Sequence, residues 1–263
     1  MEFETLSLSE EKGILHVKLN RPEKRNAINQ QLLLDVERCF SEVATGGNVR
    51  VVILSGEGKA FSSGTDLFSL GGSSGADSRS VRQLVRKAQR AFSEIENLEK
   101  AVIALIHGYA MGAAMEMILA CDLRIASEES VFTIPEVDLG LVPDLGGSQR
   151  LPRMVGVGRA KELILTGKTI SAMEAERIGL VNKVVPLEEL HKTGRDWAEE
   201  IMSNEPMAVG LAKRNIDMSF GQSVADGLES AAIAQSIVLT GENFRKRIEE
   251  RVIQRGVGKK TSQ

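Results

Sequence analysis

The sequence has few of the residues that mark disulfide-rich or zinc-binding proteins. Its 263 residues include two cysteines, Cys39 and Cys121, which are too few for a disulfide framework. No CxxC pair or Cys/His cluster occurs, and His16, His107 and His191 are too far apart in sequence to signal a metal site by their spacing. The sequence therefore predicts no metal site and indicates a reducing compartment.

An excess of basic residues and a targeting segment are also lacking. The formal net charge of −3 argues against general nucleic-acid binding, which requires a basic surface. The N-terminal residues are acidic and alternate in polarity, without the features of a signal or transit peptide, so we expect a cytoplasmic protein. The most apolar run, residues 101–121, is interrupted by glycines and an acid. It favours a buried strand turning into a buried helix over a membrane span.

That apolar run contains a single acid, Glu116, among alanine, methionine, isoleucine and leucine. Burying a carboxylate without partners costs several kcal/mol, so such an acid indicates either a functional group or a hydrogen-bonded structural one. A second acid, Glu136, also has mostly apolar neighbours, although it could simply favour a helix N-terminus after Pro135. Two isolated carboxylates on backbone rich in small residues predict proton-transfer chemistry on a small, thioester-linked substrate.

Strand and helix patterns alternate through the first two thirds of the chain. Strands are expected at residues 3–8, 14–19, 50–54, 101–106, 123–126, 131–133 and 182–185. Helices are expected at residues 29–44, 80–98, 111–120, 156–166, 171–178, 187–203, 206–220, 223–239 and 242–251. This order predicts an α/β core, residues 1–195, followed by an all-helical region, residues 196–263.

Three short motifs match known functional patterns incompletely. Residues 71–75 read GGSSG, as in the GxSxG motif of hydrolases, but a polar glycine-rich loop surrounds them instead of a strand and a helix. Gly167-Lys168-Thr169 resembles the end of a P-loop, but Glu162 stands where glycine is required. Residues 56–58 lack the third glycine of a dinucleotide fingerprint. We therefore assign no function to these motifs.

Several ordered motifs resemble the crotonase family, the enoyl-CoA hydratase/isomerase superfamily. They are residues 61–67 (FSSGTDL), 107–116 (HGYAMGAAME) and 135–143 (PEVDLGLVP), supported by residues 20–27, 146–152 and 175–181. The resemblance covers about residues 3–250. It implies a spiral of ββα turns, a C-terminal helical region that assembles homotrimers or homohexamers, and acyl-CoA thioester substrates.

The same resemblance implies an oxyanion hole formed by the backbone N–H groups of Thr65 and Ala113. The physical chemistry agrees, because the free N–H groups at a helix start favour developing negative charge. Gly112 and Ala113 are small enough for a thioester to approach, although the family often has three glycines where this chain has Gly-Ala-Ala. Tight helix packing would use the same small residues.

In the family's hydratases two glutamates act on one water, and Glu116 and Glu136 fall at those positions. The resemblance implies that Glu116 activates water and that Glu136 exchanges a proton with Cα. Asp144 adds an alternative, because the family's dienoyl-CoA isomerases have acids at all three positions. A third carboxylate could move a proton between carbons without adding water. Asp144 could also merely cap a helix that begins near Leu145.

The resemblance further implies a CoA-binding path. The residues expected to line it are Arg25, Ala27, Ser62, Gly64, Thr65, Asp66, Leu67, Phe68, Gly112 and Ala113. CoA would then be part of the substrate, and no separate cofactor is expected. Residues 248–255 lack the aromatic and proline residues with which many relatives reach a neighbour's CoA.

The leading hypothesis is therefore a 2-enoyl-CoA hydratase of fatty-acid or related acyl-CoA degradation. The first alternative is an enoyl- or dienoyl-CoA isomerase that uses Glu136 or Asp144. Other crotonase reactions, such as C–C bond formation or thioester hydrolysis, stay open, as does, from a different class, a catalytically silent scaffold or RNA-binding protein. The intact carboxylates and the acidic net charge argue against the scaffold.

Overall fold

The computed structural model describes residues 2–67 and 77–249. The chain divides into two compact units, Met1–Met202 and Ser203–Gln263. The boundary expected after residue 195 falls inside helix α8 (Leu187–Met202), all of which belongs to the first unit. Phe68 and residues 71–75, which were considered from the sequence, lie outside the described residues.

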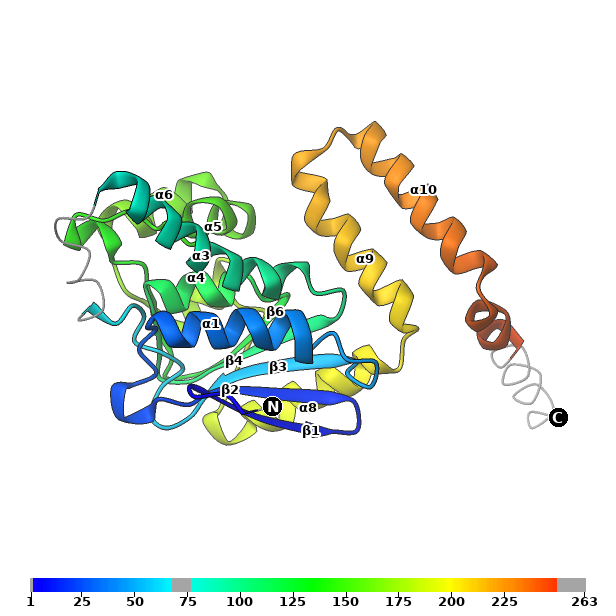
Figure 1. Ribbon diagram of the computed structural model, residues 1–263, viewed down its shortest axis with the longest axis horizontal. Coiled ribbons are helices and arrows are strands. Elements are labelled where there is room, and N and C mark those ends of the chain that lie inside the picture. The colour runs from blue at the N-terminus through cyan, green and yellow to red at the C-terminus, as the bar shows by residue number, and fades with distance from the viewer. Residues whose placement is uncertain (1, 68–76, 250–263) are drawn as a thin grey trace. The chain divides into compact units, whose positions relative to one another are not determined.

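A six-stranded sheet forms the centre of the first unit (Figure 1). In spatial order its strands are β1 (Leu6–Glu11), β2 (Ile14–Leu19), β3 (Val51–Gly56), β4 (Ala101–Ile106), β6 (Leu123–Ser127) and β9 (Lys183–Val185). The β1–β2 hairpin is antiparallel and every other pairing is parallel. These strands were predicted to within a few residues, with β1 starting at Leu6 instead of Phe3.

Helices cover both faces of this sheet. Alternate residues of β3 face opposite sides, so that Val52 and Leu54 pack in one hydrophobic cluster and Val51 and Ile53 pack in another. Helices α1 (Gln30–Arg38), α3 (Ser78–Asn97) and α4 (Ala113–Leu119) lie over the first face, and α8 lies over the second (Figure 1). Burial on both sides explains why the β3 sequence is continuously apolar.

A smaller sheet carries the turn that leads into α4. It consists of β5 (Tyr109–Met111), β7 (Val131–Thr133) and β8 (Ile170–Ser171). β5 was not predicted from the sequence, which gave a helix starting near Met111. The strand forms because it pairs with β7, from Tyr109 opposite Val131 to Met111 opposite Thr133, a partner that the local pattern does not reveal.

Side-chain caps mark the starts of α1 and α3 in this unit. The Asn29 side chain accepts a hydrogen bond from the Leu32 N–H at the start of α1, as predicted, and the helix continues into a π turn at Cys39–Val43. The remaining helical elements of this unit are η1 (Pro22–Lys24), η4 (Glu136–Leu139), α5 (Gly147–Val155), α6 (Val157–Thr166) and α7 (Ala172–Arg177).

The second unit is helical throughout its described part, as predicted. It contains α9 (Pro206–Met218), η5 (Ser219–Gly221), α10 (Val224–Thr240) and a further helix at residues 242–249. Large apolar side chains on α10, including Leu228 and Ile233, are exposed in the single chain. Assembly through this region stays a prediction. No helix within residues 2–67 and 77–249 has the length and apolar character needed to cross a membrane.

Candidate active site

The loop that carries the predicted CoA-binding residues is anchored by one buried amide. The Asn26 side chain donates to the carbonyl oxygens of Glu57, Ala60 and Phe61 at 2.9, 3.0 and 3.0 Å and accepts from the Arg21 N–H. Asn26 is fully buried and has a φ of 54°. The sequence signature around Asn26 therefore fixes the shape of the loop, since a buried amide satisfied in this way holds the two segments together.

The predicted CoA-binding residues come together on this anchored loop. The Ser63 N–H donates to the Arg25 carbonyl at 2.9 Å, so the exposed Arg25 lies beside the Ser62–Thr65 backbone. The Asp66 carboxylate lies 3.3 Å from the Arg21 guanidinium, which also donates to the Ala27 carbonyl. The Arg21 side chain therefore binds both the Ala27 carbonyl and the Asp66 carboxylate. The Leu67 side chain is exposed.

Gly64 brings the Thr65 backbone against the start of α4. Its φ is +81°, and a Cβ added there would lie 2.2 Å from the Met111 carbonyl oxygen and 3.5 Å from the Ala113 nitrogen. Only glycine permits this approach. Within the described residues, neither the Thr65 N–H nor the Ala113 N–H donates to a protein acceptor. We refer to these two N–H groups as the amide pair.

Glu116, on α4, is 1% exposed. Its Oε1 atom accepts hydrogen bonds from the N–H groups of Leu145 at 2.9 Å and Gly147 at 2.7 Å. Burial raises the pKa of Glu116 to about 8; the negative charges of Glu136 and Asp144 add to the rise, and the two N–H donors oppose it. Glu116 therefore combines a hydrogen-bonded oxygen with a proton that it can release near neutral pH.

Glu136 is the first residue of η4, and its side chain reaches toward the start of α4. A Cβ on Gly112, whose φ is +53°, would lie 2.8 Å from Oε1 of Glu136. Among the described residues, Oε2 of Glu136 is buried and has no hydrogen-bond partner. The pKa of Glu136 is raised by burial and by the charge of Asp144. A role as a helix-start residue does not account for a side chain that is turned toward Gly112.

Asp144 is the third acid, and it is half-buried. Burial raises its pKa, and its charge raises the pKa values of Glu116 and Glu136, so the three carboxyls form one coupled acid cluster. The interpretation of Asp144 as a helix cap is wrong. Helix α5 begins at Gly147 with Gly146 at the capping position, and no side chain caps it.

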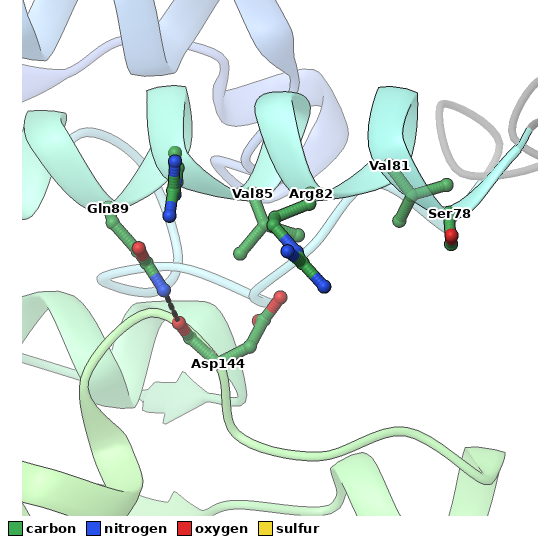
Figure 2. Close-up of a pocket in the computed structure, with 7 residues that line it drawn as sticks. Ser78, Val81, Arg82, Val85, Gln89 and Asp144 are labelled. Carbon is green, nitrogen blue, oxygen red and sulfur yellow. Dashed lines mark hydrogen bonds between the residues drawn. The ribbon is translucent and has the colours of Figure 1, made fainter.

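Two residues that the sequence reasoning missed hold the turn that contains Asp144. The Gln89 side chain on α3 donates to the Asp144 carbonyl at 2.7 Å, drawn as the dashed line in Figure 2. Arg150 donates to the Leu145 carbonyl at 2.9 Å and pairs with Glu96 at 2.6 Å. Arg150 lies in the family-like segment 146–152, so the motif could have identified it as a site residue. Nothing in the sequence identifies Gln89.

A pocket of about 720 Å³ opens beside Asp144 (Figure 2). Its lining consists of Asp144 and one face of α3: Ser78, Val81, Arg82, Val85, Arg86 and Gln89. We call it the α3 pocket. Because Asp144 is coupled to the other two acids, the α3 pocket adjoins the acid cluster.

His191 lies near enough to His16 and His107, which are distant in sequence, for their charges to affect its pKa. Burial is the largest cause of the lowered pKa of His191, and the charges of His107 and His16 lower it further. The His107 ring bonds to the Gly58 carbonyl at 3.0 Å. Within residues 2–67 and 77–249, no group of three or more His, Cys, Asp or Glu side chains is arranged to hold a metal ion.

Known proteins are similar to this chain in sequence and in fold. A family model described as enoyl-CoA hydratase/isomerase matches residues 9–252. The chain is 42% identical over 218 residues to the short-chain-enoyl-CoA hydratase of Clostridium acetobutylicum, covering 82% of each chain. It is 36% identical over 263 residues to the peroxisomal Delta(3,5)-Delta(2,4)-dienoyl-CoA isomerase of Arabidopsis thaliana, covering 96% of this chain and 95% of the other.

The fold also matches a Thermobifida fusca protein whose crystal structure is a complex with CoA. The TM-score is 0.82 and the identity 31%, with 89% of this chain and 93% of the other covered. The mixed α/β fold with a helical C-terminal region is that of a crotonase-type protein. The chain belongs to the enoyl-CoA hydratase/isomerase family.

Proposed function

We propose that this protein hydrates 2-enoyl-CoA thioesters, adding OH at Cβ and H at Cα to give 3-hydroxyacyl-CoA. The observation that carries the proposal is that the buried Glu116 carboxyl and the half-buried Glu136 carboxyl, both with raised pKa values, lie close to the start of α4. The hydratase relatives at about 40% identity support the same reaction.

The amide pair supplies the first part of the chemistry. The N–H groups of Thr65 and Ala113 donate to the thioester carbonyl oxygen and stabilise the negative charge that develops there as water attacks Cβ. Because neither N–H group donates to an acceptor within the described part of the chain, no such bond has to break when the substrate binds. Gly64 and Gly112 leave room for the carbonyl to approach.

The acid cluster supplies the protons. Hydration requires one carboxylate to accept a proton from water and one carboxylic acid to deliver a proton to Cα. We assign the first role to Glu116 and the second to Glu136. The pKa of about 8 favours a proton on Glu116 in the ligand-free chain, so these roles require the proton to reside on Glu136 once substrate is bound.

Binding and assembly follow the same proposal. CoA enters as part of the substrate, along the path of Arg25, Ala27 and the Ser62–Asp66 backbone, and no other cofactor is needed. The CoA complex of the Thermobifida fusca protein supports this. We further propose a cytoplasmic homotrimer or homohexamer, assembled through the helical second unit and acting in fatty-acid β-oxidation or related acyl-CoA degradation.

Isomerisation of dienoyl-CoA is the second candidate. Asp144 favours it, because a half-buried third carboxylate coupled to Glu136 could pass a proton between two carbons without adding water. The dienoyl-CoA isomerase of Arabidopsis thaliana, which matches almost the whole chain, supports this alternative.

The test uses the wild-type protein with crotonyl-CoA, following loss of the enoyl absorbance and identifying 3-hydroxybutyryl-CoA by mass. Fast hydration is the expected result. If crotonyl-CoA binds but is not hydrated, while a 3,5-dienoyl-CoA is converted to its 2,4 isomer, the function is isomerisation. In that case Asp144→Asn must abolish the conversion.

A further inference from the structure

The α3 pocket is lined by charged as well as apolar side chains, and binding a plain hydrocarbon chain would require only the apolar ones. Val81 and Val85 are one helical turn apart and partly buried, so they give the pocket an apolar strip. Arg82 and Arg86 are also one turn apart, and both line the same pocket. The lining therefore combines an apolar path with two guanidinium groups.

Neither of these two arginines, like Arg79 on the same helix, has an acidic partner among the described residues. On the same helix Arg90 pairs with Glu37 at 3.4 Å, and Arg150 near the pocket pairs with Glu96. Among the described residues, Arg82 and Arg86 take part in no ion pair and their side chains in no hydrogen bond. Figure 2 shows the Arg82 side chain extending from α3 into the space toward which the Asp144 carboxylate also projects.

The order of residues along α3 sets a direction. Gln89 holds the Asp144 turn at one end of the pocket, and Ser78 lines the other end. At about 1.5 Å per residue, Arg86 lies about 4.5 Å and Arg82 about 10 Å along the helix from Gln89. An acyl chain that leaves the acid cluster along Val85 and Val81 would bring its distal end to these arginines.

We propose that the α3 pocket binds acyl chains that end in a carboxylate, with Arg82 and Arg86 recognising that group. The substrate class is then a 2-enoyl-CoA with a terminal carboxylate, and this assignment rests on the proposed function. Two guanidinium groups that have no ion-pair partner among the described residues complement one anionic group. Charge-assisted bonds from arginine to a carboxylate are among the stronger hydrogen bonds in proteins. The CoA phosphates are not candidates, because the expected CoA path follows Arg25 and residues 62–66.

The test compares substrates that differ only at the distal end. Wild-type kcat/KM is measured for glutaconyl-CoA, for its neutral methyl ester and for longer chains with and without a terminal carboxylate. We expect a preference for the carboxylate of at least about tenfold, weakened by salt. Arg82→Met and Arg86→Met each reduce that preference, because they lower kcat/KM for the carboxylate-ended substrates more than for the matched neutral esters. Lys87→Met, which removes one positive charge from the same helix outside the pocket lining, leaves the preference unchanged.

Binding separates this inference from the reaction. Glutaryl-CoA and its methyl ester have no double bond, so calorimetric affinities for the two report the pocket even if no hydration occurs. Tighter binding of glutaryl-CoA, lost in the double arginine variant, supports the inference whatever the reaction. Equal binding of the two compounds would overturn it. So would arginine variants that slow neutral and charged substrates alike or shift the pH profile with crotonyl-CoA, because Arg82 would then act through Asp144.

Discussion

The acid cluster and the α3 pocket are neighbours with opposite construction. Glu116 is almost completely buried, and two backbone N–H groups hold one of its oxygens. In the α3 pocket the two arginines are exposed and take part in no ion pair among the described residues. The protein's own backbone thus binds the Glu116 carboxyl that is assigned to proton transfer. The arginines assigned to the acyl end are expected to bind a group of the substrate instead. Variants of the two regions are therefore expected to differ in kind.

The largest effect is expected where the acid cluster meets the substrate. Glu136→Gln keeps the shape of the side chain but removes its exchangeable proton, so we expect kcat to fall by roughly 10³-fold while acyl-CoA binding is retained. Steady-state kinetics and calorimetry measure the two quantities. Asp138→Asn, an exposed carboxyl on the same turn, is the control and leaves kcat unchanged. Unchanged activity in Glu136→Gln would remove Glu136 from the mechanism.

Gly64→Ala tests whether the backbone around the amide pair is as rigid as its contacts indicate. The new Cβ would lie 2.2 Å from the Met111 carbonyl at a φ of +81°. We expect a loss of about 2–4 kcal/mol of unfolding free energy and a fall in kcat of about 100-fold, since the Thr65 N–H must move.

Gly140→Ala is a matched control for that variant. Gly140 has a similar φ of +71°, but a Cβ there would meet nothing within 4 Å. Its cost is therefore the conformational strain alone, about 1 kcal/mol, with activity kept. If Gly64→Ala and Gly140→Ala lower the unfolding free energy by the same amount, the close contact between residue 64 and the Met111 carbonyl does not affect stability.

Much of this arrangement could be predicted from the sequence, because the signals are local. An acid in an apolar run predicted the burial of Glu116, and Asn29 before an amphipathic segment predicted the start of α1. What could not be predicted depends on partners far along the chain. The Gln89–Asp144 bond joins residues 55 apart, and β5 exists because β7 lies beside it. The effect of His16 and His107 on His191 could not be predicted for the same reason.

Glu116→Gln tests how much the buried charge of Glu116 lowers the unfolding free energy. The pKa of Glu116 in the folded chain, about 8, is above the ordinary value of 4.5, so the folded state binds more protons than the unfolded state between these pH values. The unfolding free energy of the wild type therefore decreases as pH rises from about 4.5 to 8. Glutamine keeps both N–H bonds and has no charge to bury.

We therefore expect Glu116→Gln to match the wild type to within about 1 kcal/mol near pH 5 and to exceed it by roughly 3–4 kcal/mol at pH 8, while hydration is lost. Denaturant unfolding at the two pH values measures the difference, with the exposed Glu128→Gln as the control. A variant that is less stable than the wild type at pH 8 would show that the carboxylate is stabilised by more than its burial costs.

The smallest effect is expected at the contact that joins the two regions. Gln89→Leu removes the 2.7 Å bond to the Asp144 carbonyl, at a cost of about 1 kcal/mol, and Gln83→Leu on the exposed side of α3 is the control. Because Arg150 still holds the Leu145 carbonyl, the N–H groups that bind Glu116 should stay in place and crotonyl-CoA hydration should change less than about threefold. The preference for a terminal carboxylate should weaken, since the position of α3 relative to Asp144 is then less restricted. A large loss of hydration with no change in that preference would mean that α3 supports the acid cluster and does not select the acyl chain.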